Sequence, residues 1–85
     1  MTRFRVAIHI EPRRGILDPQ GKAVAGALHS LGFDTVAEVR VGRYLVLDTD
    51  ASDAEAARAA ATRMCEQLLA NPVTEDFHIA TVEPA

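Results

Sequence analysis

The residues of this 85-residue chain that could do chemistry include one cysteine and three histidines. Cys65 flanks an apolar helical stripe and has no histidine base near it in sequence, so it is predicted to pack as a small hydrophobe. His9, His29 and His78 fall on three different elements without metal-ligand spacing, which argues against a zinc site. No pair of carboxylates stands out as an acid and a base. We therefore predict no catalytic residue and no metal ligand in this chain.

A helix start from Asp18 to Lys22 carries more information than these scattered groups. Asp18 can accept hydrogen bonds from the free amides of the first helical turn, and Pro19 suits the first helical position. Gly21 weakens the helix, so another segment is expected to approach its backbone closely. Lys22 places a cation beside the exposed amides. Such a helix start can bind an anion, but a plain cap beside a solvated lysine is the preferred interpretation.

Composition limits the function classes. A chain this short, 48% apolar, can build one modest core, and association would supply further burial. The net charge of −3 and the absence of a basic run argue against nucleic-acid binding. No apolar run is long enough for a membrane span, and no signal segment begins the chain, so a cytoplasmic location is expected.

Hydrophobic periodicity predicts five elements. Residues 3–11 alternate like a half-buried strand. A helix is then expected up to about residue 31, and its apolar residues at helical spacing are predicted to be buried: Val24, Ala27, Leu28 and Leu31. Capping signals place a second helix from Ser52 to about residue 70, with Ser52 and Glu55 as a capping box. Extended segments are expected over residues 35–48 and 75–82. The order strand-helix-strand-helix-strand predicts an α+β two-layer sandwich, with both helices on one face of a single sheet.

The second extended segment is predicted as one long strand bent at Gly42, because side-chain alternation continues across the glycine. A tight hairpin at Gly42 is the alternative. Tyr44 and Val46 fall on the face that should be solvated, so something, in so small a chain another subunit, is expected to cover them. Arg40, Arg43 and Tyr44 are of the residue types that anchor interfaces. A solvated sheet face balanced by a neighbouring glutamate explains the arginines equally well.

Four blocks of sequence together resemble the PurS family, the small subunit of phosphoribosylformylglycinamidine synthase. They are GILDPQGKAV at 15–24, LGF at 31–33, VRVGR at 39–43 and NPVTEDF at 71–77. The resemblance covers nearly the whole chain in the right order, and it is most specific at residues 17–22 and 71–76. The family often has lysine, isoleucine and tyrosine at Arg43, Thr74 and Phe77, which are mild departures. The resemblance implies a single PurS-like domain over residues 1–85.

The PurS resemblance further implies a subunit without chemistry of its own in de novo purine biosynthesis. Such a subunit forms a homo-oligomer, a dimer or a tetramer, and bridges a glutaminase subunit and an ATP-dependent synthetase subunit of a carbon-nitrogen ligase. Ammonia from glutamine then converts formylglycinamide ribonucleotide to formylglycinamidine ribonucleotide. No cofactor is expected in this chain, whereas ATP and magnesium are expected in the synthetase subunit.

Two sets of contact residues are predicted. The candidates for contact with the larger subunits are Asp18, Gln20, Gly21, Lys22, Arg40 and Arg43. The candidates for the homo-oligomer contact are Gly42, Tyr44 and Val46. The alternative from another functional class is a regulatory module that binds a metabolite, which rests on fold analogy alone. A free-standing enzyme is the least favoured alternative.

Overall fold

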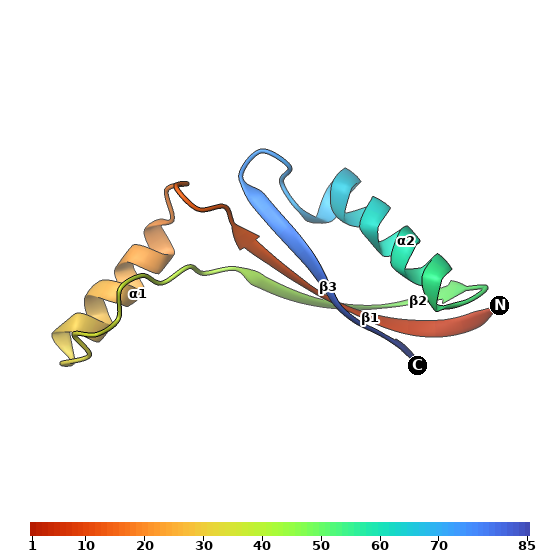
Figure 1. Cartoon of the computed structure of the whole chain (residues 1–85), viewed down its shortest axis with the longest axis horizontal. Helices are drawn as coiled ribbons and strands as arrows, with labels where there is room; N and C mark the ends of the chain where they lie inside the picture. Colours follow the sequence, from red (N-terminus) through yellow and green to blue (C-terminus); the bar gives the residue numbers. More distant parts are fainter.

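The computed structural model describes residues 1–85 and contains the predicted succession of elements (Figure 1). These are β1 (Thr2–Pro12), α1 (Pro19–Ser30), β2 (Arg43–Ala51), α2 (Ala54–Met64), a π-helical turn η1 (Cys65–Leu69) and β3 (Glu75–Pro84). The α+β class and the order strand-helix-strand-helix-strand are therefore confirmed. None of the helices is both long and apolar enough to cross a bilayer.

The three strands form one antiparallel sheet in the order β2-β1-β3. Ile8 of the central strand lies opposite Leu45 of β2 and Ile79 of β3, and a bulge interrupts the pairing with β3 just before Ile8. Alternation along β1 sends Val6, Ile8 and Ile10 to one face, where each is fully buried or nearly so. This face carries the core.

Helix α2 covers the core face of the sheet with small side chains. Ala57 and Ala61 of α2 and Cys65, the first residue of η1, recur at helical spacing and are completely buried. The helix backbone can therefore lie close to the strands. The N-cap of α2 is Asp53, which accepts a hydrogen bond of 2.8 Å from the Ala56 amide. The predicted cap, Ser52, is one residue too early, because aspartate and serine are both good caps and only one of these adjacent residues can take the position.

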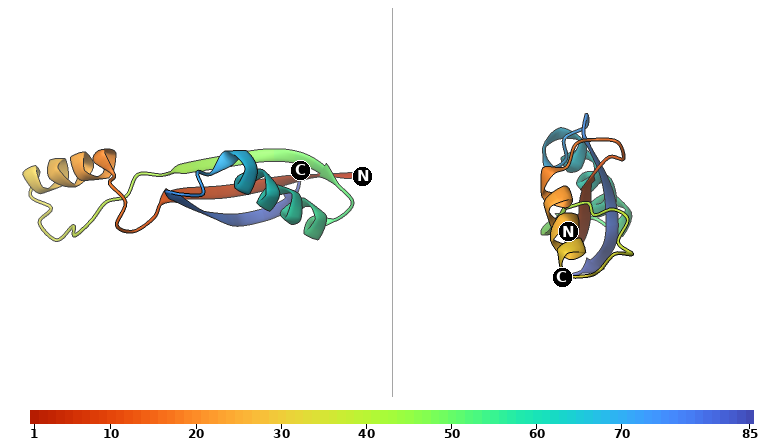
Figure 2. Two further views of the ribbon diagram at one scale, coloured as in Figure 1. Left: turned by 90° about the horizontal axis from the view of Figure 1, so that it is seen from above. Right: turned by 90° about the vertical axis from the view of Figure 1, so that its left-hand side faces the viewer.

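The predicted packing of both helices on one face of the sheet is wrong for α1. No substantial packing joins α1 to the sheet or to α2, and the helix projects beyond the end of the sheet (Figures 1 and 2). Val24 and Leu31, expected in the core, are 41% and 73% exposed. The core face explains this outcome, because three strands span only about 14 Å and a helix about 10 Å wide already covers most of that width.

The predicted long strand over residues 35–48 is also wrong in its first half, because pairing in β2 begins only at Arg43. Arg43 lies opposite Ile10, and β1 ends only two residues later, at Pro12. The chain therefore has no strand beside most of the residues that precede Arg43. Residues 34–42 run instead as an unpaired segment that leads into β2, and no hairpin forms at Gly42 (Figure 1). We call α1 and residues 31–42 together the arm. It gives the molecule a long dimension of 52 Å.

Candidate partner-binding site

The arm is fastened to the sheet at an elbow built around Asp18, the N-cap of α1. One carboxylate oxygen of Asp18 accepts from the Gly21 amide at 3.0 Å, and the other accepts from the Val41 amide at 2.9 Å. The first bond starts the helix, and the second ties that start to the returning chain. Asp18 is therefore a cap, as predicted, and is also the clamp that fixes the arm beside the end of the sheet.

Two glycines let the returning chain pass through the elbow. An added Cβ at Gly21 would overlap the carbonyl oxygen of Val39, and one at Gly42 would overlap the carbonyl oxygen of Ile10. The close approach predicted at Gly21 is confirmed. Gly42 serves the same purpose at the end of β1, so within this chain both glycines are required by backbone packing.

The elbow encloses a pocket of about 230 Å³ whose lining has mixed charge. Lys22 and Arg40 face it together with the carboxylates of Asp18 and Glu38. The Asp18 carboxylate already accepts a hydrogen bond from the Gly21 amide, and the two cations of the lining are balanced by its two carboxylates. The pocket therefore has no net preference for an anion, which agrees with the interpretation as a plain helix cap. The side chains of Gln20 and Lys22 are exposed.

Arg43 is engaged within the chain. Its guanidinium donates to the carbonyl oxygen of Leu69 at 2.9 Å and to the carboxylate of Glu75 at 2.8 Å. The same carboxylate oxygen accepts from the Asn71 amide at 2.8 Å. Arg43 thus joins the starts of β2 and β3 to the end of η1, an internal role that the interpretation as an interface arginine did not include.

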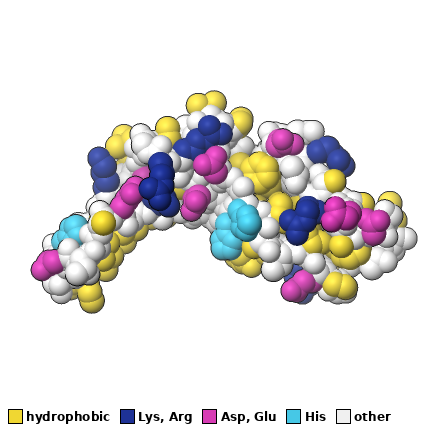
Figure 3. Space-filling model, in the orientation of Figure 1, with side chains coloured by type: hydrophobic (Ala, Val, Ile, Leu, Met, Phe, Trp, Pro, Cys, Tyr) yellow, Lys and Arg dark blue, Asp and Glu magenta, His cyan; other side chains and the backbone are white.

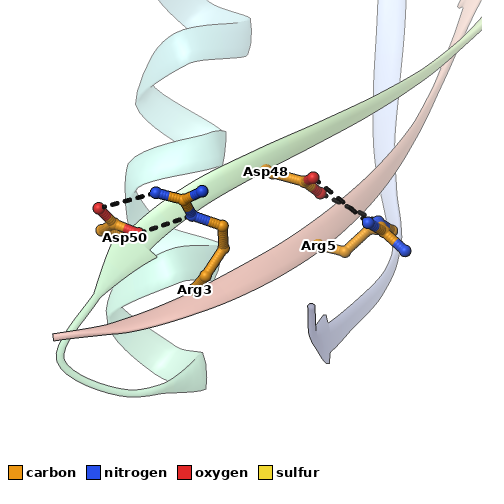
Figure 4. A network of polar contacts seen from close by, with 4 residues as sticks. All are labelled: Arg3, Arg5, Asp48 and Asp50. Atoms are coloured by element: carbon orange, nitrogen blue, oxygen red, sulfur yellow. Dashed lines mark hydrogen bonds and ion pairs between the residues drawn. The ribbon is translucent and has the colours of Figure 1, made fainter.

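The sheet face opposite α2 is uncovered and has two parts. At one end, Arg3 and Arg5 of β1 form ion pairs of 2.9 and 3.0 Å with Asp50 and Asp48 of β2 (Figure 4). Toward the elbow the face becomes apolar and aromatic. Tyr44 and Val46 are 59% and 53% exposed there.

Aromatic side chains meet across this uncovered face. The Tyr44 ring lies against the ring of His9 with 4.7 Å between their centroids, and His78 of β3 lies opposite His9 in the register. Tyr44 and Val46 therefore occupy the face on which they were predicted, and no part of this chain covers them.

The arm presents the other exposed apolar surface. Its exposed large apolar residues are Val24, Leu31 and Phe33, and the exposed Ile16 and Leu17 come just before it in the chain. Figure 3 shows apolar side chains gathered along the lower edge of the arm, which borders a broad concavity below the elbow. The prediction from sequence assigned Val24 and Leu31 to the core of this chain. Their helical spacing predicted burial, but both side chains are exposed in this chain.

The carboxylates of the elbow and the sheet imply a specific pH dependence. Hydrogen bonds from the amides of Val41 and Gly21 hold the pKa of Asp18 below its ordinary value. Hydrogen bonds from Arg5 and Arg3 likewise lower the pKa values of Asp48 and Asp50. A carboxyl group whose pKa is lower in the folded state stabilises that state above its unfolded pKa, near 4, and loses the contribution as the pH falls through the folded pKa.

We therefore expect these three carboxylates to leave the free energy of unfolding unchanged down to about pH 4. At more acidic pH their protonation should lower it. Asn at position 18 cannot accept both amide hydrogen bonds as a carboxylate does. The Asp18→Asn variant should accordingly be less stable than the parent chain at pH 6, and the difference should shrink toward pH 3. Urea unfolding at both pH values measures this, and a difference that does not change with pH would contradict the assignment.

Comparison with known proteins places the chain among sequences of one kind. The family model PurS, phosphoribosylformylglycinamidine (FGAM) synthase, matches residues 5–83. The phosphoribosylformylglycinamidine synthase subunit PurS of Bacillus subtilis is 39% identical over 80 residues, which are 94% of each chain.

Solved structures agree with the sequence match. The structure of Thermus thermophilus PurS has a TM-score of 0.85 at 41% identity and covers 98% of both chains. A PurS-like chain in the structure of PurLQS from Thermotoga maritima has a TM-score of 0.83 at 30% identity, covering 93% of this chain and 96% of that one. The chain therefore belongs to the PurS family, whose members are subunits of phosphoribosylformylglycinamidine synthase.

Proposed function

We propose that this chain, taken as one functional domain over residues 1–85, is the non-catalytic subunit that bridges the glutaminase and synthetase subunits of phosphoribosylformylglycinamidine synthase. The observation that carries the proposal is the arm, which holds a row of exposed apolar side chains away from the sheet. Exposed apolar surface of this kind marks protein interaction. The elbow keeps the arm in one orientation, which suits a part that must position other subunits.

In this proposal the chemistry belongs to the larger subunits. The glutaminase releases ammonia from glutamine, and the synthetase uses ATP and magnesium to activate formylglycinamide ribonucleotide for amination. This chain holds the two in a productive arrangement in the cytoplasm and binds no cofactor itself. The solved PurLQS assembly of a 30% identical relative supports the existence of such a complex for this chain.

The proposed contacts follow the two exposed regions. The uncovered sheet face, with Tyr44 and Val46 beside Gly42, is the proposed homo-oligomer contact, a dimer or a tetramer. The elbow is the proposed contact with the larger subunits. Of its candidates, the exposed Gln20 and Lys22 and the partly exposed Arg40 are the proposed direct contacts. Asp18, Gly21 and Arg43 hold the geometry that presents them.

The proposal is tested by turnover of formylglycinamide ribonucleotide with the two larger subunits, with glutamine or ammonia as the nitrogen source. Glutamine-dependent turnover should require this chain, whereas turnover with added ammonia should not. Lys22→Glu should lower the glutamine-dependent rate by about tenfold or more, since one lost interface contact of 1.4 kcal/mol changes binding tenfold. Ammonia-dependent turnover should be unchanged.

The matched control is Arg63→Glu, which makes the same charge change on the exposed side of α2. It should leave both rates unchanged. If neither nitrogen source responds to the presence of the chain, the bridging proposal fails. Stabilisation of the isolated chain by a purine-pathway metabolite would then favour the regulatory module.

A further inference from the structure

The loop between η1 and β3, residues 70–74, is held in one conformation by its own polar groups. We call it the brace loop. The Asn71 side chain accepts a hydrogen bond from the Val73 amide at 3.0 Å, and the Asn71 carbonyl oxygen accepts from the Glu75 amide at 2.8 Å. The Glu75 carboxylate accepts in turn from the Asn71 amide at 2.8 Å. Such bonds between side chains and nearby backbone fix a turn, so the brace loop can support segments that are bound to it.

Arg13 attaches the chain that leaves β1 to the brace loop, which lies beside the end of that strand (Figure 1). The Arg13 amide donates to the carbonyl oxygen of Thr74 at 2.9 Å. The guanidinium donates to the carbonyl oxygen of Pro72 at 2.8 Å and pairs with the Asp76 carboxylate at 3.1 Å. A planar guanidinium holds its N–H donors in fixed directions, so one side chain can bind two acceptors at once. Three contacts therefore fix the point from which the chain departs toward α1.

The chain that returns from the arm is attached to the same loop by Arg43. Its guanidinium bonds to Leu69 at one end of the brace loop and to Glu75 at the other. The clamp between Asp18 and Val41 joins the outgoing and returning chains to each other. Two chains that are joined only to each other can still swing together about the end of the sheet. A support to one side of them, which the brace loop supplies, prevents this movement.

We propose that Arg13 is a positioning residue for the transfer of ammonia between the larger subunits, because it braces the arm in the direction that aligns them. The inference rests on the proposed bridging function and deepens it. Arg13 touches no substrate and acts through the arm. An arm that is free to swing would leave the larger subunits bound but misaligned. Ammonia released by the glutaminase would then escape to the solvent before it reaches the synthetase.

The exposure of the Arg13 contacts separates direction from stability. The side chains of Arg13 and Asp76 are 47% and 65% exposed, and exposed ion pairs contribute little to the free energy of unfolding because water screens them. The hydrophobic core includes neither residue. Removal of the Arg13 side chain should therefore leave the fold intact and loosen the arm.

The first test measures how much ammonia reaches product when the two larger subunits work with a saturating amount of this chain. Each glutamine hydrolysed releases one glutamate and one ammonia, and each formylglycinamidine ribonucleotide formed takes up one ammonia. The parent chain should give nearly equal amounts of glutamate and product. Arg13→Leu should raise the ratio of glutamate to product at least about twofold, because a small misplacement slows a transfer step. At saturation, a chain that is merely less stable would leave the ratio unchanged.

Three comparisons make this test specific. Turnover with added ammonia should be the same for the parent chain and Arg13→Leu, since the synthetase then needs no transfer. Arg13→Lys keeps the positive charge beside Asp76 but lacks the planar set of donors, so its ratio should be intermediate. The matched control is Arg58→Leu, which removes an exposed arginine of α2 that forms no ion pair in this chain. It should behave like the parent chain.

The second test measures the direction of the arm in the isolated chain. Spin labels on Ser30→Cys, at the end of α1, and on Ala59→Cys, on the exposed side of α2, report the distance between arm and body. The native Cys65 is completely buried and out of reach of the label. Labelled chain is mixed with an excess of unlabelled chain, so that only distances within one copy are measured. Arg13→Leu should broaden the distance distribution, and circular dichroism verifies that the variant folds.

The two tests fail in different ways. An unchanged distance distribution in Arg13→Leu would show that Arg13 does not brace the arm. A broadened distribution with an unchanged ratio of glutamate to product would overturn its part in ammonia transfer while bridging stands. If glutamine-dependent turnover does not need this chain at all, the bridging function and the part of Arg13 in it fail together. If Arg13→Leu does not fold, the same outcomes are judged on Arg13→Lys.

Discussion

Gly42→Ala is expected to lower the free energy of unfolding by about 1–3 kcal/mol, the usual cost of forcing an extra methyl group into a packed site. The added Cβ would overlap the carbonyl oxygen of Ile10 and also approach Glu11 Cα to 3.1 Å. Both atoms belong to the backbone of the central strand and cannot rotate away as a side chain could. In a domain of this size, each 1 kcal/mol corresponds to about 4–8 °C in the melting temperature.

Gly26→Ala is the matched control for this prediction. Gly26 lies within α1, and an added Cβ there would meet no atom within 4 Å. Alanine should favour the helix by up to about 1 kcal/mol, so the melting temperature should stay the same or rise. Thermal unfolding of the three chains at one protein concentration makes the comparison, since association shifts apparent stability. Equal effects of the two substitutions would show that Gly42 does not serve close packing.

The parts of the fold that local chemistry determines could be predicted from the sequence. The alternation of β1 follows from one buried and one solvated face, and the start of α1 follows from the Asp18 cap and Pro19. The need for glycine at position 21 also followed, because a residue that weakens a helix is kept where another segment comes close. Each of these signals is read from neighbouring residues.

The arm could not be predicted in the same way, because periodicity reports that a face is buried but not by which chain. Val24 and Leu31 have the spacing of a packed helix, yet nothing in this molecule covers them. Residues 36–41 alternate like a strand, yet the strand they would pair with is missing from the chain. Both errors came from assigning to one copy a burial that we propose the assembly completes.

The candidate site was foreseen in its residue types more than in its geometry. The patterning placed Tyr44 and Val46 on an uncovered face. The clamp between Asp18 and Val41 joins positions 23 residues apart, and no local pattern encodes such a contact. Arg43 was assigned to an interface because arginine is frequent there, but its guanidinium is bonded within the chain, to the carboxylate of Glu75 and to the end of η1.

Tyr44→Glu is expected to shift sedimentation to smaller species and to weaken self-association at least about tenfold, a cost of 1.4 kcal/mol or more. The Tyr44 ring is 59% exposed and lies against His9 on the uncovered face. If a second copy covers this face, the ring is buried in the assembly. A carboxylate in its place would lose its hydration on burial, which is costly.

Two further variants separate the loss of the aromatic contact from the effect of added charge. Tyr44→Phe keeps the ring and its contact with His9, so association should stay within about threefold of the parent chain. Ala59→Glu adds the same charge to the exposed side of α2 and should change nothing. A normal sedimentation profile of Tyr44→Glu would mean that this sheet face is not the contact between copies. Association that is weakened in Tyr44→Glu, but not in Tyr44→Phe or Ala59→Glu, would mean that a second copy covers the face at Tyr44.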